Sequence, residues 1–335
     1  MSIETDFPGV TKQNRDQLGA AAAYYNENYD IAFKQVLETG GHQQRLGIKP
    51  CPCRFCGRSI PAVTFGKIAH AIPEFVGNGT LVAHYECDEC NERFSAFEDD
   101  LAKMTLLHRV AGQIIGKSGV PSAKTPQKLS RIDMGASGLE IKHFIDDPIV
   151  TIDDIAHTLK IRMTSQPYRP LGAFKALAKM AVSVMDDDDV ARVPETLLWL
   201  RSNDLTTDQI DDGTNYSCLR TFTPGPAPYP RSVVILLRRK SAVVLGPQFI
   251  FAVAFGNLSF QIIVPAPQLD HQLAGQTLTL HPVPLFPFML AENVKGATAA
   301  WCESFTSPDK TKAPHEISFK FDSMSEVVAA KGAQS

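Results

Sequence analysis

Two Cys-x-x-Cys pairs, Cys53 with Cys56 and Cys87 with Cys90, constrain the fold of this chain more than any other feature. Four thiolates in this pattern favour a tetrahedral Zn²⁺ site that leaves no open position and is therefore structural. Thirty residues separate the pairs, more than in a compact zinc ribbon, so a segment is inserted between them. Cys51 is a spare that could replace Cys53, although the Cys53 pair has the better spacing. The pattern predicts that one zinc ion holds two distant stretches of chain together.

The bulk composition is that of an ordinary globular protein. The chain has 335 residues, of which 44% are hydrophobic and 21% charged, with a net charge of −3. This length predicts two domains, and the charge excludes a chain that binds polyanions over its whole surface. We recognise no signal peptide and no run of about 18 apolar residues, so we expect a cytoplasmic protein without a membrane partner. In that reducing compartment, clustered cysteines favour metal binding over disulfides.

Composition shifts along the chain suggest four parts. Residues 1–47 should form an N-terminal helical arm, with a helix over about 16–38 before the Gly-Gly stop. Residues 48–118 contain the cysteine module. Residues 119–131, rich in Gly, Pro, Ser and Lys, read as a basic linker. Residues 132–335 should form a larger C-terminal domain.

The C-terminal domain is predicted to be α+β with an antiparallel sheet. A helix is expected over 168–185, because Pro170 suits a first turn and apolar residues follow at helical spacing. A short helix should follow near residues 195–201. Runs of β-type residues bounded by turn signals predict strands at 139–144, 148–153, 157–163, 231–240, 249–266, 277–283 and 316–321, with hairpin turns at Arg239-Lys240 and Gly256-Asn257.

The cysteine module also carries a resemblance to a known family. Between the two pairs lie Ala69-His70-Ala71-Ile72-Pro73 and Gly77-Asn78, and Asn91 directly follows the last cysteine. This order resembles the HNH endonucleases of the ββα-metal class, in the subset held together by a four-cysteine zinc site. The resemblance is confined to about residues 53–101. It implies a strand bearing a catalytic histidine, a loop, a second strand, and a helix that begins at the second pair.

The resemblance assigns roles to three residues. His70 corresponds to the general base that deprotonates the attacking water, a task suited to a neutral imidazole near pH 7. Asn91 corresponds to a ligand of a catalytic Mg²⁺ or Mn²⁺ ion. Asn78 corresponds to the middle asparagine, whose side-chain carbonyl would orient His70. Gly77-Asn78-Gly79 is equally a good tight turn, which would give Asn78 a purely structural role.

One position departs from the family pattern. Many members have an acidic metal ligand just before the histidine, and here that residue is Ala69. Glu98, two helical turns beyond Asn91, is the first choice to replace it, and Glu74 is the second. Glu86, on the second strand, is expected to face solvent.

A local basic stretch could hold a nucleic acid. Residues 101–132 include six Lys or Arg and no Asp or Glu. These cations would contact phosphates of a nucleic acid whatever its base sequence. The alternative is a soluble lysine-bearing linker. The candidate phosphate contacts are Lys103, Arg109, Lys117, Lys124, Lys128 and Arg131.

The sequence therefore predicts a metal-dependent HNH endonuclease that hydrolyses DNA. The C-terminal domain would target or regulate it through a small-molecule or protein activator, in a layout like that of bacterial anti-phage effectors. The alternative is a zinc-stabilised interaction module that binds nucleic acid or protein and has lost catalysis. The sequence does not predict an oligomeric state.

Overall fold

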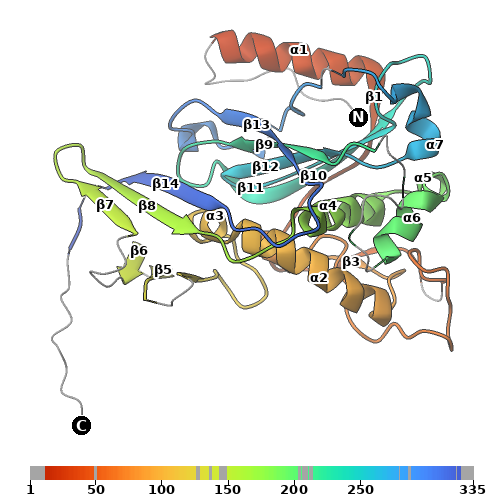
Figure 1. Ribbon diagram of the computed structural model, residues 1–335, viewed down its shortest axis with the longest axis horizontal. Helices are drawn as coiled ribbons and strands as arrows, with labels where there is room; N and C mark the ends of the chain where they lie inside the picture. The colour runs from red at the N-terminus through yellow and green to blue at the C-terminus, as the bar shows by residue number, and fades with distance from the viewer. Residues whose placement is uncertain are drawn as a thin grey trace.

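The computed structural model describes most of the chain as an α+β fold built around one large antiparallel sheet (Figure 1). The described residues are 12–48, 51–125, 129–135, 138–142, 149–202, 205, 210, 214–278, 280–285, 288–321 and 323–325. Lys128 lies outside them.

The large sheet has six strands in the order β1-β10-β11-β12-β9-β13, and all its pairings are antiparallel. A tight turn at Gly256-Asn257 joins β11 to β12, as predicted, with Gly256 in the left-handed region at φ +58°. The strands are β1 (Tyr29–Val36), β9 (Ser217–Phe222), β10 (Tyr229–Arg239), β11 (Phe249–Gly256), β12 (Leu258–Ile263) and β13 (Ala299–Ser304).

Both faces of the six-stranded sheet are covered. Along β10, Val234 and Leu236 face the core that contains α4 (Pro170–Val184) and α2 (Asp88–Met104), whereas Val233 and Ile235 face α1 (Lys12–Asn28). Figure 1 shows this layering, with α1 on one side of the sheet and α4 and α2 on the other. Two-sided burial explains why β10 and β11 are continuous apolar runs rather than alternating ones.

The segment between the cysteine pairs forms a compact ββα arrangement against α4. β3 (Leu81–Ala83) pairs with the main chain around His70 in antiparallel fashion and with β2 (Gln44–Leu46) in parallel. A short 3₁₀ turn, η1 (Glu74–Val76), lies in the connecting loop, and α2 and α3 (Leu106–Ala111) follow.

Two small sheets and several short helices complete the fold. β14 (Pro314–Lys320), β8 (Thr158–Thr164) and β7 (Val150–Asp153) form one sheet, and β4 (Ala123–Lys124), β5 (Arg131–Gly135) and β6 (Gly138–Lys142) form the other. The short helices are α5 (Asp187–Ala191), α6 (Pro194–Arg201), α7 (Pro267–Asp270), η2 (His271–Leu273) and η4 (Ala291–Asn293). Within the described ranges, none of the helices has the length and apolar character needed to cross a lipid bilayer.

The N-terminal segment differs from its prediction. The expected helix over 16–38 ends at Asn28, and Tyr29–Val36 is instead the edge strand β1, paired with β10. Alternating Tyr29, Ile31 and Phe33 support a strand, and pairing with a partner some 200 residues away overrides the helical propensity of the flanking sequence. The predicted helix at 168–185 is confirmed as α4, whereas residues 280–283, within the strand expected at 277–283, form none.

Candidate functional site

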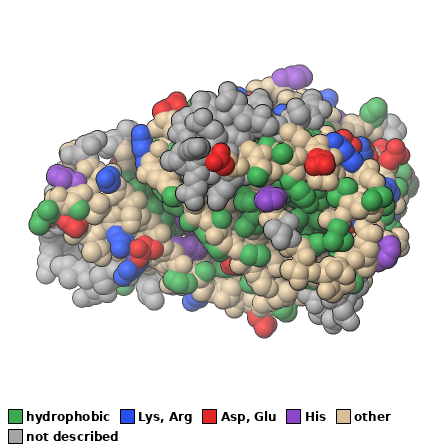
Figure 2. All heavy atoms as spheres, turned by 90° about the horizontal axis from the view of Figure 1, so that it is seen from above, with side chains coloured by type: hydrophobic (Ala, Val, Ile, Leu, Met, Phe, Trp, Pro, Cys, Tyr) green, Lys and Arg blue, Asp and Glu red, His purple; other side chains and the backbone are tan. Residues whose placement is uncertain are grey.

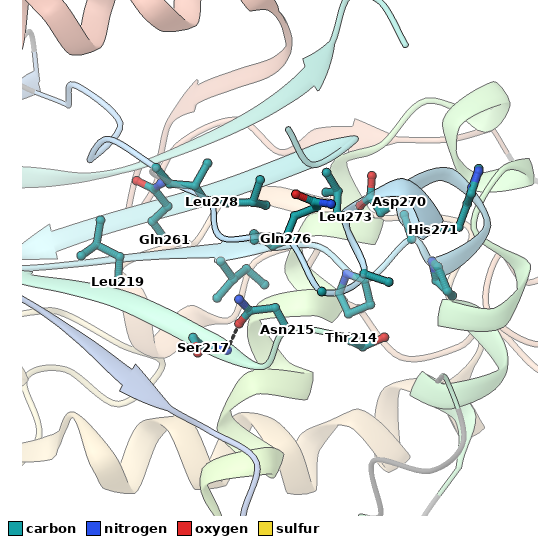
Figure 3. Close-up of a pocket in the computed structure, with 18 of the residues that line it drawn as sticks. Thr214, Asn215, Ser217, Leu219, Gln261, Asp270, His271, Leu273, Gln276 and Leu278 are labelled. Atoms are coloured by element: carbon teal, nitrogen blue, oxygen red, sulfur yellow. Dashed lines mark hydrogen bonds between the residues drawn. The ribbon is translucent and has the colours of Figure 1, made fainter. Parts of the chain in front are cut away.

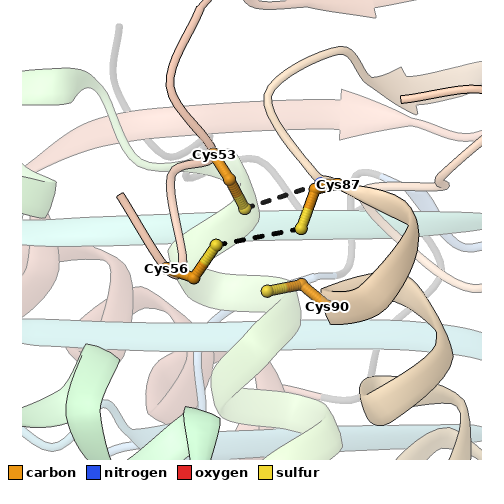
Figure 4. A group of neighbouring side chains, drawn as sticks. All are labelled: Cys53, Cys56, Cys87 and Cys90. Carbon is orange, nitrogen blue, oxygen red and sulfur yellow. Dashed lines mark hydrogen bonds between the residues drawn. The ribbon is translucent and has the colours of Figure 1, made fainter. Parts of the chain in front are cut away.

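The four predicted zinc ligands converge at one point. The Sγ atoms of Cys53, Cys56, Cys87 and Cys90 all lie within 4.8 Å of one another, and the side chains point to a common centre (Figure 4). A Zn²⁺ ion with Zn–S bonds of about 2.3 Å in a tetrahedron requires sulfurs about 3.8 Å apart, and Cys56 Sγ to Cys87 Sγ is 3.8 Å. The donor set therefore fits a structural zinc ion.

The local backbone structure positions the four cysteines. Gly57 adopts a left-handed φ of +70° and its N–H donates to Cys53 O at 2.7 Å, which closes the first knuckle. Cys87 caps the N-terminus of α2, so the second pair lies on the first helical turn. Hydrogen bonding with Cys90 lowers the pKa of the Cys53 thiol to about 4, which favours the thiolate that a metal requires. The spare Cys51 lies outside the cluster and its thiol contacts the carbonyl of His84.

His70 forms an isolated antiparallel bridge with Val82 of β3. Ala71 N donates to Leu81 O at 3.2 Å, and Ala83 N donates to Ala69 O at 2.8 Å, so the histidine is flanked by two main-chain bonds to the neighbouring strand. Its side chain is 17% exposed. The main chain around the imidazole is thus fixed, and the ring retains access to solvent.

Asn78 holds the loop that joins the two strands. Its side chain is buried; Nδ2 donates to Ile72 O and Leu81 O, and Oδ1 accepts from the N–H groups of Thr80 and Leu81. Among the described residues, no hydrogen bond joins Asn78 to His70. The side-chain carbonyl that was predicted to orient the imidazole is occupied by main-chain donors, so Asn78 affects His70 through the shape of the loop.

Three charged side chains set the electrostatics of His70. Burial lowers the pKa of the imidazole, the nearby Glu74 carboxylate opposes this, and the positive charges of Lys179 and Lys117 lower it further. The net shift is downward, so the ring is neutral near pH 7. Nδ1 lies 3.8 Å from Glu74 Oε2, which leaves Nε2 for a water molecule.

A buried ionic network lies behind His70. Lys179 Nζ donates to the main-chain oxygen of His70 at 2.9 Å and lies 3.2 Å from both Glu98 Oε1 and Glu86 Oε2. The side chains of Lys179 and Glu86 are 1% and 0% exposed, so the prediction that Glu86 faces solvent is wrong. Burial raises the pKa of Glu86 to about 7, against the opposing effect of Lys179, and Oε1 of Glu86 has no hydrogen-bond partner within the described structure.

Sequence reasoning missed Lys179, because it belongs to α4, far from the cysteine module. A signal was nonetheless present. α4 is apolar all round except for its serine and two lysines four residues apart, and such a helix must be buried together with its lysines. A buried lysine requires acceptors, which the sequence alone does not identify.

The predicted metal ligands occupy different places along α2. Asn91 is half-buried on the first turn, and its side chain makes no hydrogen bond within the described structure. Lys179 contacts both Glu98 and the main-chain oxygen of His70. Burial raises the pKa of Glu98, Lys179 opposes this shift, and the negative charge of Glu74 adds to it. Glu74 thus offers a carboxylate beside the imidazole, and Glu98 offers one beside Lys179; carboxylate oxygens are donors that Mg²⁺ prefers.

The predicted phosphate-contacting residues do not form one surface. Lys117 and Lys124 are exposed, Lys103 pairs with Asp99, and Arg131 pairs with Asp133. Arg109 is 6% exposed; its guanidinium donates to Ala102 O and lies 5.1 Å from the centre of the Phe75 ring, so a phosphate contact does not fit its position. Lys117 is the member of the set whose charge acts on His70.

The described residues on the α1 side of the molecule show no continuous run of cationic side chains. Figure 2 shows the α1 side, where Lys and Arg side chains stand singly, several of them beside acidic ones. A continuous phosphate-binding track would require clustered cations.

A cavity lies at one end of the six-stranded sheet. It has a volume of about 400 Å³ and is bounded by β9, β12 and the segment after β12 (Figure 3). The described lining contains no lysine or arginine; Asn215, Ser217, Asp270 and Gln276 provide polar groups among leucines, isoleucines and prolines. Burial raises the pKa of Asp270 to about 6, and Gln248 N donates to its Oδ1 at 2.8 Å. The lining suits a neutral or cationic small molecule better than an anion.

Comparison with known families identifies one segment. A family model described as HNH endonuclease matches residues 53–107. The matched segment contains the four cysteines, the His70 strand, β3, α2 and the start of α3. No curated protein and no solved structure matches the chain.

Proposed function

We propose that this protein is a metal-dependent endonuclease that hydrolyses phosphodiester bonds of DNA. One observation carries the proposal. The segment that matches the HNH endonuclease model places His70 on a strand of a ββα unit, and the four converging cysteines lie at the base of that unit. His70 is neutral near pH 7, half-buried, and fixed in its main chain. These are the properties required of a general base.

His70 acts on the attacking water. Nε2 accepts a proton as the water oxygen bonds to phosphorus, and the bond from phosphorus to the leaving sugar oxygen breaks. The downward pKa shift from burial, Lys179 and Lys117 keeps the imidazole unprotonated before the reaction. Glu74, 3.8 Å from Nδ1, stabilises the imidazolium that forms.

The metal site would be built from oxygen donors. Asn91 and Glu98 would hold a Mg²⁺ or Mn²⁺ ion, with Glu74 as the alternative carboxylate in place of the side chain that Ala69 lacks. When bound, this ion supplies charge stabilisation at the scissile phosphate and the leaving oxygen. Lys117 binds a flanking phosphate of the DNA, and Lys124 extends this contact.

Plasmid cleavage tests the proposal. Purified protein with Mg²⁺ or Mn²⁺ should nick or linearise supercoiled DNA, and His70→Ala should reduce the rate by about 10²- to 10⁴-fold. Zinc content and the urea unfolding midpoint of the variant should match those of the wild type. Cleavage by His70→Ala within about threefold of wild type would assign the base to another residue.

Regulation would come from the remainder of the chain. Residues 132–335 form a targeting or sensing domain in this proposal, joined to the nuclease module of residues 48–118 by the basic linker. The cavity beside β9 and β12 is the proposed activator site, and its lining favours a neutral or cationic ligand. A role in anti-phage defence predicts that the wild-type gene, but not its His70→Ala form, reduces phage plaque number.

A second function has an observation in its favour. Ala69 provides no metal ligand, and Glu86 and Glu98 are already paired with Lys179. A zinc-stabilised module that binds nucleic acid or protein without cutting would have these features. DNA binding by a wild type that cleaves with neither Mg²⁺ nor Mn²⁺, with or without cell extract, would favour this function.

A further inference from the structure

Lys179 reaches the site from outside the matched segment. It lies on α4, beyond residues 53–107, and its side chain is 1% exposed. Three oxygens lie close to Lys179 Nζ: it donates to His70 O at 2.9 Å and to Glu98 Oε1 at 3.2 Å, and it forms an ion pair with Glu86 Oε2 at 3.2 Å. Its position is therefore defined on all sides.

Two of these three acceptors belong to the proposed active site. The bond to His70 O fixes the main chain of the base itself, on a strand whose neighbours Ala69 and Ala71 are bonded to the partner strand. The bond to Glu98 Oε1, at 3.2 Å, holds the carboxylate that we propose as a metal ligand. A group that only needed to neutralise Glu86 would require neither contact.

Lys175 provides an internal comparison. It lies one turn earlier on α4 and is equally buried, but Nζ donates to Trp199 O at 2.8 Å and Ser202 O at 3.0 Å. The Nζ atom of Lys175 also lies over the aromatic rings of Trp199 and Phe97. Both of these acceptors lie at the end of α6, so burial of a lysine on this helix does not by itself direct its ammonium group to His70.

We propose that Lys179 is a positioning residue of the nuclease site, which holds the His70 main chain and the Glu98 carboxylate in their working geometry. The inference rests on the proposed nuclease function. It assigns part of the active site to α4, so the segment that matches the family model does not contain all the residues that the reaction requires.

A charge-balanced pair of variants separates positioning from simple stability. Lys179→Met alone leaves Glu86 buried without a cation and should destabilise the protein. Lys179→Met combined with Glu86→Gln removes both charges and should restore the urea unfolding midpoint toward that of Glu86→Gln alone. The double variant should retain one zinc per chain.

Cleavage kinetics give the main readout. Against Glu86→Gln as reference, the double variant should lose about 10- to 100-fold in kcat, with KM for duplex DNA changed less than threefold, because misplacement of a base by about 1 Å has an effect of this size. Lys175→Met should lose stability yet keep kcat within about threefold of wild type. Equal kcat in the double variant and in Glu86→Gln would reduce Lys179 to a structural role.

Hydrogen exchange keeps the test independent of cleavage. In the double variant, amides of residues 69–72 should exchange faster than in Glu86→Gln, while exchange in β10 and β11 stays the same. Unchanged exchange at residues 69–72 overturns the inference even if the wild type proves inactive. Faster exchange there in a protein that never cleaves would support the positioning contact and reject the proposed nuclease function.

Discussion

At the scale of single residues, three carboxylates around Lys179 and His70 differ in their burial and in their partners. Glu86 is buried beside Lys179, and Glu98 contacts the same lysine through Oε1. Glu74 lies 3.8 Å from the imidazole of His70, and its side chain is 32% exposed. Glu74 and Glu98 can therefore meet a hydrated metal ion. In the proposed metal site, Ala69 supplies no ligand and the amide oxygen of Asn91 contributes no charge, so a carboxylate from Glu98 or Glu74 would be needed.

The first prediction concerns which carboxylate binds the metal. Glu98→Gln keeps size and helix propensity but removes the charge, so we expect it to raise the Mg²⁺ concentration required for half-maximal cleavage about tenfold, the effect of a lost charged ligand on metal affinity. Glu74→Gln is the matched control. A normal Mg²⁺ titration for Glu98→Gln together with a shifted one for Glu74→Gln would move the assignment to Glu74.

The second prediction concerns Asn78. Replacing it with Ala removes four hydrogen bonds to loop main-chain groups that are buried, so the free energy of unfolding should fall by about 2–4 kcal/mol in urea titrations. Asn91→Ala is the control, because that half-buried side chain has no hydrogen bond in the described structure. It should change stability by less than about 0.5 kcal/mol while weakening metal-dependent cleavage. Equal stability losses in the two variants would contradict this account.

At the scale of secondary-structure elements, the joint between α3 and β14 contains two largely buried histidines. The rings of His108 and His315 lie 5.4 Å apart, near Arg220 and Phe222. Burial, with the charges of its neighbours, lowers the pKa of His108 to about 3. Burial and Arg220 lower that of His315 to about 4, although Glu303 opposes the shift.

The third prediction is acid sensitivity at this joint. Histidines in the unfolded chain bind protons below about pH 6.5. In the folded protein, His315 stays neutral until about pH 4 and His108 until about pH 3. Their contribution is complete above pH 6.5 and is lost as the pH falls toward 4, by about 1–2 kcal/mol for each imidazole by pH 5. Urea midpoints at pH 7.5 and 5.0 measure the loss. His108→Phe should lose less on acidification than wild type, and an equal loss would exclude His108 as a cause.

The elements differ in how far the sequence predicts them. The cysteine spacing predicts the zinc cluster, and Pro170 with its apolar period predicts α4, because both signals are local. The strand β1 could not be predicted, since its partner β10 is remote and the preceding alanines favour a helix. The contact of Lys179 with His70 also depends on how α4 packs against α2. Long-range packing of this kind leaves no spacing pattern in the chain.

At the scale of the whole molecule, one hydrophobic core joins the matched segment to the large sheet. Phe94, Phe97 and Leu101 of α2 share it with Phe174 of α4 and Phe251 of β11. Arg54, in the first cysteine knuckle, donates to the carbonyls of residues 182, 183 and 185 at the end of α4. The matched segment is therefore anchored to the large sheet and α4 by apolar and polar contacts.

The fourth prediction tests the division into parts. Residues 48–118 expressed alone would expose the apolar side of α2, so we expect a fragment that binds zinc but lacks cooperative thermal unfolding and cleaves no DNA. Residues 48–202, which add α4 with Lys179 and the short helices after it, are the matched comparison and should be the more soluble fragment. Cooperative unfolding of the 48–118 fragment, with cleavage at the rate of the full chain, would show that the module is self-sufficient.

The distance in sequence between His70 and Lys179 has a consequence for protein synthesis. The two residues are 109 positions apart, and a ribosome adding about 5–20 residues per second needs on the order of 5–20 s to cover them. The zinc knuckles and the His70 hairpin, whose contacts are closer in sequence, leave the exit tunnel first. On the proposal above, the nascent chain carries an incomplete site until α4 has emerged and docked, so cleavage would begin only after Lys179 reaches His70.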